Sequence, residues 1–378
     1  MQSPVKETKW YSWCTGKLSK GCTYCVQGRK LVLFITGLCA QKCFYCPISE
    51  QKFGKDVVFA NESKIQDPTN PVEMLKEVEL TEAYGAGITG GDPLMNVDRC
   101  CAYIKILKSK FGKQFHIHLY TPLKLVNNER LQRLYEAGLD EIRVHPSLDD
   151  NSLWDRVNLA KQFNWTLGAE IPAIPGYDEK TKVLIDYLSD KVSFININEL
   201  ELSDTQTTHY KLGELNYHPK DYVSYGVKGS QEMALRMLEY SRQKNLSAHF
   251  CTAKLKDAVQ VRKRLQFRAK HVALPSDEIS EDGTLIRGCI YSKELTPGKK
   301  ESNKEKATEE LKAKLDLIKK ELKLSSNEVM LDKTKSRILV SHKKVRSNNK
   351  RLKKMNLIPA IVEEYPTADA FEVEVEFL

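Results

Sequence analysis

The sequence predicts an α/β protein in which repeated βα units build a mainly parallel sheet, followed by a small C-terminal α+β domain. Three observations predict this class. Short apolar runs alternate with helix-length segments as far as residue 270, as they do in chains of βα units. Around residues 274–283 the composition shifts to Pro, Ser, Asp and Gly, which is typical of a domain boundary. Beyond that boundary, the run FEVEVEF at 371–377 alternates strictly between apolar and acidic residues, as a strand does.

Six βα units are expected in series. The first strand is the apolar run LVLFIT, and each later strand is followed by a segment with apolar residues at helical spacing. The predicted strands are 31–36, 87–89, 115–120, 141–144, 167–174 and 194–202, with a further candidate at 247–250. The predicted helices are 71–84, 97–111, 129–137, 152–163, 180–188, 232–242 and a strongly basic helix at 255–270.

The C-terminal part is predicted to contain a helix at 308–323 and strands at 338–340 and 371–377. We therefore expect three parts along the chain. These are a cysteine-containing N-terminal extension at 1–29, a region of βα units at 30–274 and a basic α+β domain at 275–378.

Composition restricts the class of protein. With 378 residues, 41% of them hydrophobic and 29% charged, the chain is a folded globular protein rather than a disordered or collagen-like one. No apolar run approaches the roughly 20 residues that a membrane helix needs, and residues 1–28 lack the apolar core of a secretory signal. We expect a cytoplasmic protein without a membrane partner.

The net charge of +9 is concentrated near the C-terminus. Residues 299–355 contain 19 Lys and Arg against 8 Asp and Glu, so the rest of the chain is slightly acidic. Such a segment can bind phosphate backbones, although a solvated charged face is the commoner role, and the aromatic residues that would stack on bases are sparse there.

The chain has ten cysteines, and in a reducing compartment this number indicates metal or redox chemistry rather than disulfides. Cys39, Cys43 and Cys46 have the spacing CxxxCxxC directly after the first strand. Three thiolates can hold a cubane iron–sulfur cluster whose fourth iron stays open for chemistry. Gly37 and Pro47 bracket the segment and favour a loop over a helix in which the cysteines only pack.

Two alternatives use other cysteines. Cys22 and Cys25, together with Cys43 and Cys46, also fit the four-cysteine pattern of structural zinc, but this set leaves Cys39 unused. The adjacent pair at 100–101 falls inside a predicted helix, where packing in the core is the expected role.

A second motif follows the second predicted strand. Gly90-Gly91-Asp92-Pro93 is an ordinary tight turn when taken alone, but it follows the cysteine motif by about 44 residues at the end of a strand. Because glycine has no Cβ, backbone at positions 90 and 91 can be approached closely by a ligand.

With these two motifs, the chain resembles the radical S-adenosylmethionine (SAM) superfamily over roughly residues 30 to 250. The segments KLVLFITGLCAQKCFYCP and GITGGDP look more narrowly like an archaeal group related to pyruvate formate-lyase activating enzyme, with Asp92 where the superfamily motif has Glu.

The resemblance implies a partial, TIM-like (β/α)6 barrel in which Cys39, Cys43 and Cys46 bind a 4Fe–4S cluster. It also implies that Tyr45 and the 90–93 motif, Gly90, Gly91, Asp92 and Pro93, bind SAM. The reduced cluster would cleave SAM to a 5′-deoxyadenosyl radical, which makes the protein an oxidoreductase-type enzyme. It would be served by an electron donor such as ferredoxin or flavodoxin.

Cys22 and Cys25 form a further CxxC just before the first strand. They could hold a second iron–sulfur cluster or a zinc ion with Cys14 or Cys251, or less readily with Cys289 or His249. Reduced or redox-active thiols are the alternative.

Polar residues at other strand ends would face the same barrel mouth if the register is as expected. These are His118, Tyr120, Arg143, His145, Glu170 and Glu201. The substrate is not identified by the sequence: a small molecule, a peptide or RNA would each fit. A modification enzyme is favoured, because an activase of glycyl-radical enzymes would have little need of the basic C-terminal domain. A non-catalytic, zinc-containing nucleic-acid-binding protein is the remaining alternative.

Overall fold

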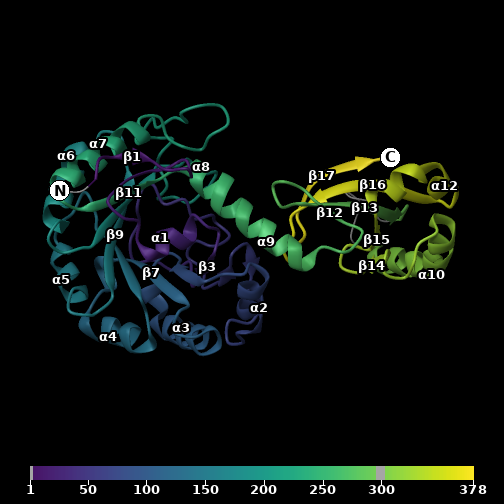
Figure 1. The fold of residues 1–378 in the computed structure, drawn as a ribbon, viewed down its shortest axis with the longest axis horizontal. Helices are drawn as coiled ribbons and strands as arrows, with labels where there is room; N and C mark the ends of the chain where they lie inside the picture. Colours follow the sequence, from purple (N-terminus) through teal and green to yellow (C-terminus); the bar gives the residue numbers. More distant parts are fainter. Residues whose placement is uncertain (1–2, 295–302) are drawn as a thin grey trace. The chain divides into compact units, whose positions relative to one another are not determined.

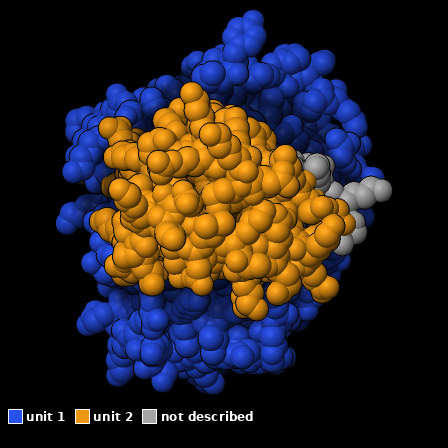
Figure 2. Space-filling model, turned by 90° about the vertical axis from the view of Figure 1, so that its right-hand side faces the viewer, with its two compact units in different colours: residues 1–261 blue, residues 262–378 orange. Residues whose placement is uncertain are grey.

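The computed structural model describes residues 3–294 and 303–378, and the chain divides into two compact units, Met1–Val261 and Arg262–Leu378 (Figure 2). The division falls within the predicted basic helix at 255–270 rather than after it, 13 residues before the predicted boundary. No helix in the described ranges combines the length and apolar character needed to cross a membrane. All ten cysteines are free thiols.

Unit 1 is built on parallel strands with helices outside them, as predicted (Figure 1). Neighbouring parallel strands follow one another in chain order, so each crossover helix returns to the outer face of the sheet. The parallel strands are β3 (Lys30–Phe34), β6 (Gly85–Thr89), β7 (His116–Pro122), β8 (Glu141–His145), β9 (Thr166–Ala173), β10 (Phe194–Glu199) and β11 (Ser247–Cys251). The helices between them are α2 (Val72–Leu80), α3 (Val97–Phe111), α4 (Asn128–Ala137), α5 (Val157–Ala160), α6 (Asp178–Leu188) and α7 (Ser230–Gln243).

Short antiparallel strands extend this sheet at both ends, and it does not close on itself, which agrees with a partial barrel. They are β1 (Lys6–Glu7) and β2 (Trp13–Thr15) beside β11, and β4 (Phe59–Ala60) and β5 (Ser63–Lys64) beside β3. Three 3-10 turns, η1 (Pro93–Asn96), η2 (Leu123–Leu125) and η3 (Trp154–Arg156), follow strands.

The N-terminal extension contributes α1 (Lys20–Cys25), which packs against β3, β6 and β7 inside the curve of the sheet (Figure 1). Gly21 makes this fit possible. A Cβ at that position would lie 2.5 Å from Arg143 Nη2 and 2.8 Å from Glu141 Oε1. The extension is therefore part of the barrel interior rather than a separate arm.

Local signals explain most helix ends. The side chain of Asn127 accepts a hydrogen bond from Arg130 N at the start of α4, and Gly138, with φ 103°, ends it in the left-handed conformation. Asn96 caps α3 in the same way by accepting from Arg99 N. The apolar stripe that predicted α3 is buried, and it includes Cys100 and Cys101.

Three predicted helices differ from the structure. The one at 71–84 ends at Leu80, because Thr81 Oγ1 donates to Glu77 O and Glu82 takes a positive φ of 47°. The one at 152–163 shortens to η3 and α5, since the Trp165 indole donates to Ala160 O and ends the helix. The basic helix is divided into α8 (Ala253–Leu255), a π-helical segment η4 (Lys256–Val261) and α9 (Arg262–Val272).

Unit 2 is an antiparallel α+β unit with the strand order β14-β15-β13-β16-β17 and with β12 beside β13. Apolar residues of its helices pack with those of the central strands in one cluster. Its strands are β12 (Glu278–Ile279), β13 (Leu285–Ser292), β14 (Met330–Asp332), β15 (Arg337–Val340), β16 (Leu357–Glu364) and β17 (Glu372–Phe377), and its further helices are α10 (Lys304–Leu322), α11 (His342–Ser347) and α12 (Asn349–Lys354).

Candidate active site

The cysteine motif lies on an irregular loop at 37–55, after the carboxyl end of β3. Gly37 N donates to Lys55 O and Gly54 N donates to Gly37 O, so the loop closes on itself at its base. A Cβ at Gly37 would lie 1.6 Å from Lys52 O, which excludes any other residue there without rearrangement. The alternative in which the three cysteines form one face of a helix is wrong, because residues 39–46 are not helical.

The three cysteines are half-buried and line one cavity of about 300 Å³. Part of the second motif and the ends of neighbouring strands line the same cavity. The lining includes Cys39, Cys43, Cys46, Tyr45, Gly90, Gly91, Pro93, Tyr120, Thr121, His145, Glu170 and Asn198. The fold thus brings together two motifs that are separate in the sequence. Their cofactor-binding role stays a prediction.

Packing explains Gly91 in a way that the sequence did not suggest. Gly91 N donates to Thr36 O and Asp92 N to Leu38 O, which joins the turn to the cysteine loop. A Cβ at Gly91 would lie 2.4 Å from Leu38 O and 2.9 Å from the Cβ of Cys39. The missing side chain therefore makes room for the loop itself, and not only for a ligand.

Asp92 supports the turn from behind the cavity. Its side chain is fully buried, and Oδ1 accepts hydrogen bonds from Leu94 N at 3.0 Å and Thr121 Oγ1 at 2.8 Å. Burial raises the pKa of this carboxyl to about 6, against the hydrogen bonds that lower it. Asp92 does not line the cavity, unlike Gly90, Gly91 and Pro93.

Tyr45 is held over the strand ends by His145. Tyr45 Oη lies 2.9 Å from His145 Nε2, and His145 Nδ1 lies 2.6 Å from the carbonyl oxygen of Glu170. Because a carbonyl only accepts, Nδ1 must carry the proton, and the neutral ring then accepts from the tyrosine at Nε2. Burial lowers the pKa of His145 and so favours this neutral form.

A polar wall closes the inner side of the cavity. Glu170 accepts hydrogen bonds from Arg143 Nη1 at 2.9 Å, Asn196 Nδ2 at 3.1 Å and Asn198 Nδ2 at 2.9 Å. Burial tends to raise the pKa of Glu170, but Arg143 and the two amides outweigh it and the pKa is lowered. The sequence reasoning missed both asparagines. Their alternation with isoleucine in FININE was the available signal, since polar residues at every second position of a buried strand share one face.

The other predicted strand-end residues lie elsewhere. Arg143 is buried deeper, where its guanidinium binds Glu141 at 2.6 Å and Tyr120 Oη at 3.0 Å. The ring of His118 is buried, with Nε2 2.9 Å from Tyr120 Oη. Glu201 lines neighbouring cavities and pairs with Lys256. The expected common barrel mouth therefore holds only part of this set.

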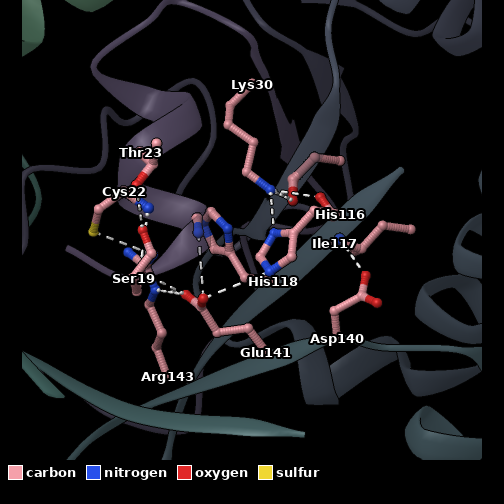
Figure 3. Close-up of polar contacts among 12 residues, drawn as sticks. Ser19, Cys22, Thr23, Lys30, His116, Ile117, His118, Asp140, Glu141 and Arg143 are labelled. Carbon is pink, nitrogen blue, oxygen red and sulfur yellow. Dashed lines mark hydrogen bonds and ion pairs between the residues drawn. The ribbon is translucent and has the colours of Figure 1, made fainter. Parts of the chain in front are cut away.

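Below the wall, buried charges connect α1 to the strands (Figure 3). Lys30 Nζ donates to Ala86 O at 2.9 Å and His116 O at 2.5 Å, and lies 3.0 Å from His116 Nδ1. Glu141 lies beside Arg143 and accepts from Ser19 Oγ at 3.4 Å. We call these residues, Ser19, Lys30, His116, Glu141 and Arg143, the barrel-base network.

Cys22 and Cys25 line a second cavity, of about 110 Å³, together with Cys251 and His249. Cys14 does not line it, and Cys289 belongs to β13 of unit 2. The four-cysteine zinc set is divided, because Cys22 and Cys25 line this cavity whereas Cys43 and Cys46 line the larger one.

The donor set at the larger cavity fits a cubane cluster. Within residues 3–294 and 303–378, no three His, Cys, Asp or Glu side chains converge on a single metal ion. A cubane binds each thiolate at a different iron, so its ligands stand further apart than those of one ion. Three half-buried thiols that line one cavity beside the backbone of a glycine turn are compatible with a cubane.

Comparison with known proteins shows the family to which the chain belongs. The pattern of the Radical SAM superfamily matches residues 33–188. A Methanocaldococcus jannaschii protein named as a putative glycyl-radical enzyme activating enzyme is 40% identical over 95% of this chain and 92% of its own length. GTP 3′,8-cyclase of Staphylococcus aureus is 29% identical over 34% of this chain and 37% of its own length.

Two solved structures show weaker likeness. Methylornithine synthase has a TM-score of 0.38 and 15% identity over 60% of this chain and 71% of its own. Escherichia coli coproporphyrinogen III oxidase, a radical SAM enzyme, has a TM-score of 0.37 and 10% identity over 60% and 56%. The assignment depends on the superfamily pattern and the long match: the chain belongs to the radical SAM superfamily, in the group related to glycyl-radical activases.

Proposed function

We propose that this radical SAM enzyme holds its 4Fe–4S cluster through Cys39, Cys43 and Cys46, binds SAM against the Gly90-Gly91 turn and Tyr45, and acts on a substrate admitted to the same cavity. The observation that carries the proposal is the lining of one cavity of about 300 Å³ by both motifs. When bound, the cluster supplies the electron that breaks a carbon–sulfur bond of the SAM sulfonium.

The chain's own residues position and enclose the reactants. The turn at 90–91 fixes the cysteine loop and offers backbone groups to the polar end of SAM. The His145 ring holds Tyr45 in place, and its neutral state at physiological pH keeps an extra positive charge away from the sulfonium. Glu170 and Asn198 line the same cavity and present polar atoms to a substrate.

The electron donor and the compartment belong to the same proposal. A radical SAM enzyme needs a one-electron reductant, and we propose a ferredoxin or a flavodoxin. We also propose a cytoplasmic location, which the ten free thiols support because such thiols persist in a reducing environment.

The test is an anaerobic assay of SAM cleavage. Protein reconstituted with iron and sulfide is reduced with dithionite, and 5′-deoxyadenosine is measured by chromatography. We expect product from the parent and from Cys101→Ala, a matched variant of a buried cysteine outside the cavity. Cys43→Ala should give none. Product at the parental rate from Cys43→Ala would exclude the assigned ligand.

For the substrate we propose modification of RNA. Residues 333–362 of unit 2 contain ten Lys and Arg and no Asp or Glu. Six of these side chains are exposed on α11 and α12: Lys343, Arg346, Lys350, Arg351, Lys353 and Lys354. Lys343 and Arg346 pair with Glu278 and Glu376, so Lys350, Arg351, Lys353 and Lys354 on α12 are the side chains that we propose to contact a phosphate backbone.

Activation of a glycyl-radical enzyme is the second candidate. It is favoured by the name of the M. jannaschii relative, whose match spans nearly the whole chain and therefore includes unit 2. The presence of the basic domain thus does not argue against an activase, contrary to the expectation from the sequence.

Salt-dependent binding separates the two candidates. Affinity for mixed transfer RNA should fall steeply between about 50 and 200 mM salt, because each neutralised phosphate releases a counterion. Lys350→Glu/Lys353→Glu/Lys354→Glu should weaken binding, whereas Lys306→Glu/Lys312→Glu on α10, where both lysines already pair with glutamates, should change it less. Absence of binding at the lower salt would exclude RNA as the substrate. The remaining candidate substrates would be a protein glycine, a peptide or a small molecule.

A further inference from the structure

The second cavity is surrounded by thiols that the proposed function does not use. Cys22, Cys25 and Cys251 all line a space of about 110 Å³, and His249 lines it too. Two of the thiols come from α1 and the third from the end of β11, more than 220 residues later. Chain topology alone brings them together.

The positions of these side chains follow from the register of the strands. β11 lies parallel to β10, with His249 beside Asn196 and Cys251 beside Asn198. Cys22 and Cys25 are three residues apart on α1 and therefore lie on one side of the helix. Cys14 is opposite His249 in the antiparallel pair of β2 and β11, yet it does not line the cavity.

His249 carries a nitrogen that lacks a partner. The residue is 4% exposed, its Nε2 lies 3.1 Å from Ser12 Oγ, and its Nδ1 has no hydrogen-bond partner in the part of the chain that the structure describes. A buried polar atom without a partner costs free energy, so such an atom beside a cavity indicates a missing ligand. When Nε2 holds the proton and donates it to Ser12, the lone pair on Nδ1 is free to bind a metal.

Two side-chain donors lie within hydrogen-bond distance of the Cys22 sulfur. Its sulfur accepts from Asn196 Nδ2 at 3.1 Å and from Arg143 Nη2 at 3.4 Å. Hydrogen bonds of this kind to ligand sulfur stabilise the anionic form and adjust the reduction potential of a bound cluster. Arg143 is itself fixed by Glu141 and Glu170, so the donor cannot easily turn away.

The size of the cavity favours a cluster over a single ion. A water-sized particle needs roughly 10–15 Å³, and the cavity is several times larger. Three thiols and one imidazole line this cavity, which is the number of side-chain ligands that a four-iron cubane takes.

We propose that Cys22, Cys25 and Cys251 hold a second iron–sulfur cluster inside the barrel, with His249 Nδ1 as its fourth ligand. This site needs neither SAM nor the cysteine loop. The cavity shares Tyr120, Glu170 and Asn198 with the larger one, so the second cluster lies behind the polar wall that faces the substrate.

The experiment counts iron and identifies each centre in the full chain. Protein reconstituted anaerobically is analysed for iron, acid-labile sulfide and zinc, and the dithionite-reduced form is examined by electron paramagnetic resonance with and without SAM. We expect about eight iron atoms per chain, four for each cubane. Cys39→Ala/Cys43→Ala/Cys46→Ala should keep about four, with a signal that SAM does not change.

The complementary variant carries the decisive test. Cys22→Ala/Cys25→Ala/Cys251→Ala should also keep about four iron atoms, with the SAM-sensitive signal and uncoupled SAM cleavage intact. The matched control, Cys14→Ala, should retain the full content. A loop triple variant without iron, or with one zinc in place of a cluster, would overturn the proposal. Absence of SAM cleavage in the parent protein with its iron content intact would instead count against the proposed function.

Single substitutions keep the test valid if a triple variant does not fold. Cys251→Ser should lower the iron content while circular dichroism shows parental secondary structure. His249→Ala should keep the iron but shift the resonance signal and the reduction potential of the SAM-insensitive centre. An unchanged signal and potential in His249→Ala would exclude the histidine ligand, and an unchanged iron content in Cys251→Ser would exclude Cys251.

Discussion

The cysteine loop and the barrel-base network position cysteines in different ways. The loop carries Cys39, Cys43 and Cys46 itself, whereas the network fixes α1, which carries Cys22 and Cys25. The loop is irregular, its cysteines are half-buried, and backbone hydrogen bonds and close glycine contacts fix its shape. The barrel-base network surrounds α1 with buried ion pairs and hydrogen bonds between side chains (Figure 3). A site at the surface can be assembled from one short segment, whereas a site in the interior needs charges contributed by several strands.

This contrast leads to different sensitivities. Removal of a side-chain polar group should cost little stability at the loop and much in the barrel-base network, because uncompensated buried charge is expensive. A larger side chain should destabilise the loop, because backbone atoms are already in contact there. Four substitutions test the contrast, in order of decreasing expected effect.

The largest effect is expected for Arg143→Met. The guanidinium is 2% exposed and pairs with Glu141 at 2.6 Å and Glu170 at 2.9 Å, so its removal leaves the buried Glu141 and the half-buried Glu170 without their cation. We expect the free energy of unfolding to fall by about 3–5 kcal/mol, measured by urea denaturation. Arg236→Met is the control, since its partner Asp178 is near the surface and the loss should stay below about 1 kcal/mol. Equal losses in both variants would contradict the contrast.

The second effect concerns Lys30, whose amine is buried in the barrel-base network. Burial lowers the pKa of Lys30 to about 7 from its ordinary 10.5. Between these values the unfolded chain binds a proton that the folded chain does not, so the free energy of unfolding rises as the pH increases from about 7 to 10. The expected slope is on the order of 1.4 kcal/mol per pH unit.

Urea denaturation of the parent and of Lys30→Met across this pH range measures that slope. The contribution should vanish in Lys30→Met, so the difference between the two proteins isolates the buried amine from other groups that titrate in the range. A slope of the same size in both proteins would show that Lys30 does not titrate between these values.

The third effect is steric and belongs to the loop. A Cβ in Gly91→Ala would lie 2.4 Å from Leu38 O, which is backbone and cannot turn aside. Strain of about 1–3 kcal/mol should displace the loop, so both iron content and SAM cleavage should fall. Gly213→Ala adds the same methyl group where no atom lies within 4 Å and should change neither. Retained iron with weakened SAM binding would restore the simpler idea that Gly91 only makes room for the cofactor.

The same contrast explains what the sequence could predict. The loop site follows from spacing, because Cys39, Cys43 and Cys46 are neighbours along the chain and the glycine turn ends the next strand. The set at the second cavity does not, since Cys14 and Cys251 are equally suitable until the register of β2, β10 and β11 is known. The pairing of strands that are distant in the sequence decides whether Cys14 or Cys251 lines the cavity, and the local sequence pattern carries no information about that pairing.

Unit 2 shows a further limit. The strand β16 was not among the predicted strands; it contains Pro359, which cannot donate to a neighbouring strand and normally indicates an edge, yet β16 is paired on both sides. In β13, Gly288 interrupts the apolar run because α11 approaches there, and a Cβ would lie 2.5 Å from Val345. In both places tertiary contacts override the local preference.

The smallest effect is expected for Tyr45→Phe, which removes only the hydroxyl that contacts His145 Nε2 at 2.9 Å. The ring keeps its edge contact with Phe44, at 5.0 Å between centroids, so the loop should keep its shape and its iron. One hydrogen bond in a partly exposed place contributes about 0.5–1.5 kcal/mol, which corresponds to a roughly two- to tenfold weaker affinity for SAM if the tyrosine orients the cofactor. Equilibrium binding of SAM, followed by calorimetry on the reconstituted protein, measures the change. A loss of stability as large as that of Arg143→Met would mean that the loop depends on buried polar contacts as much as the barrel-base network does.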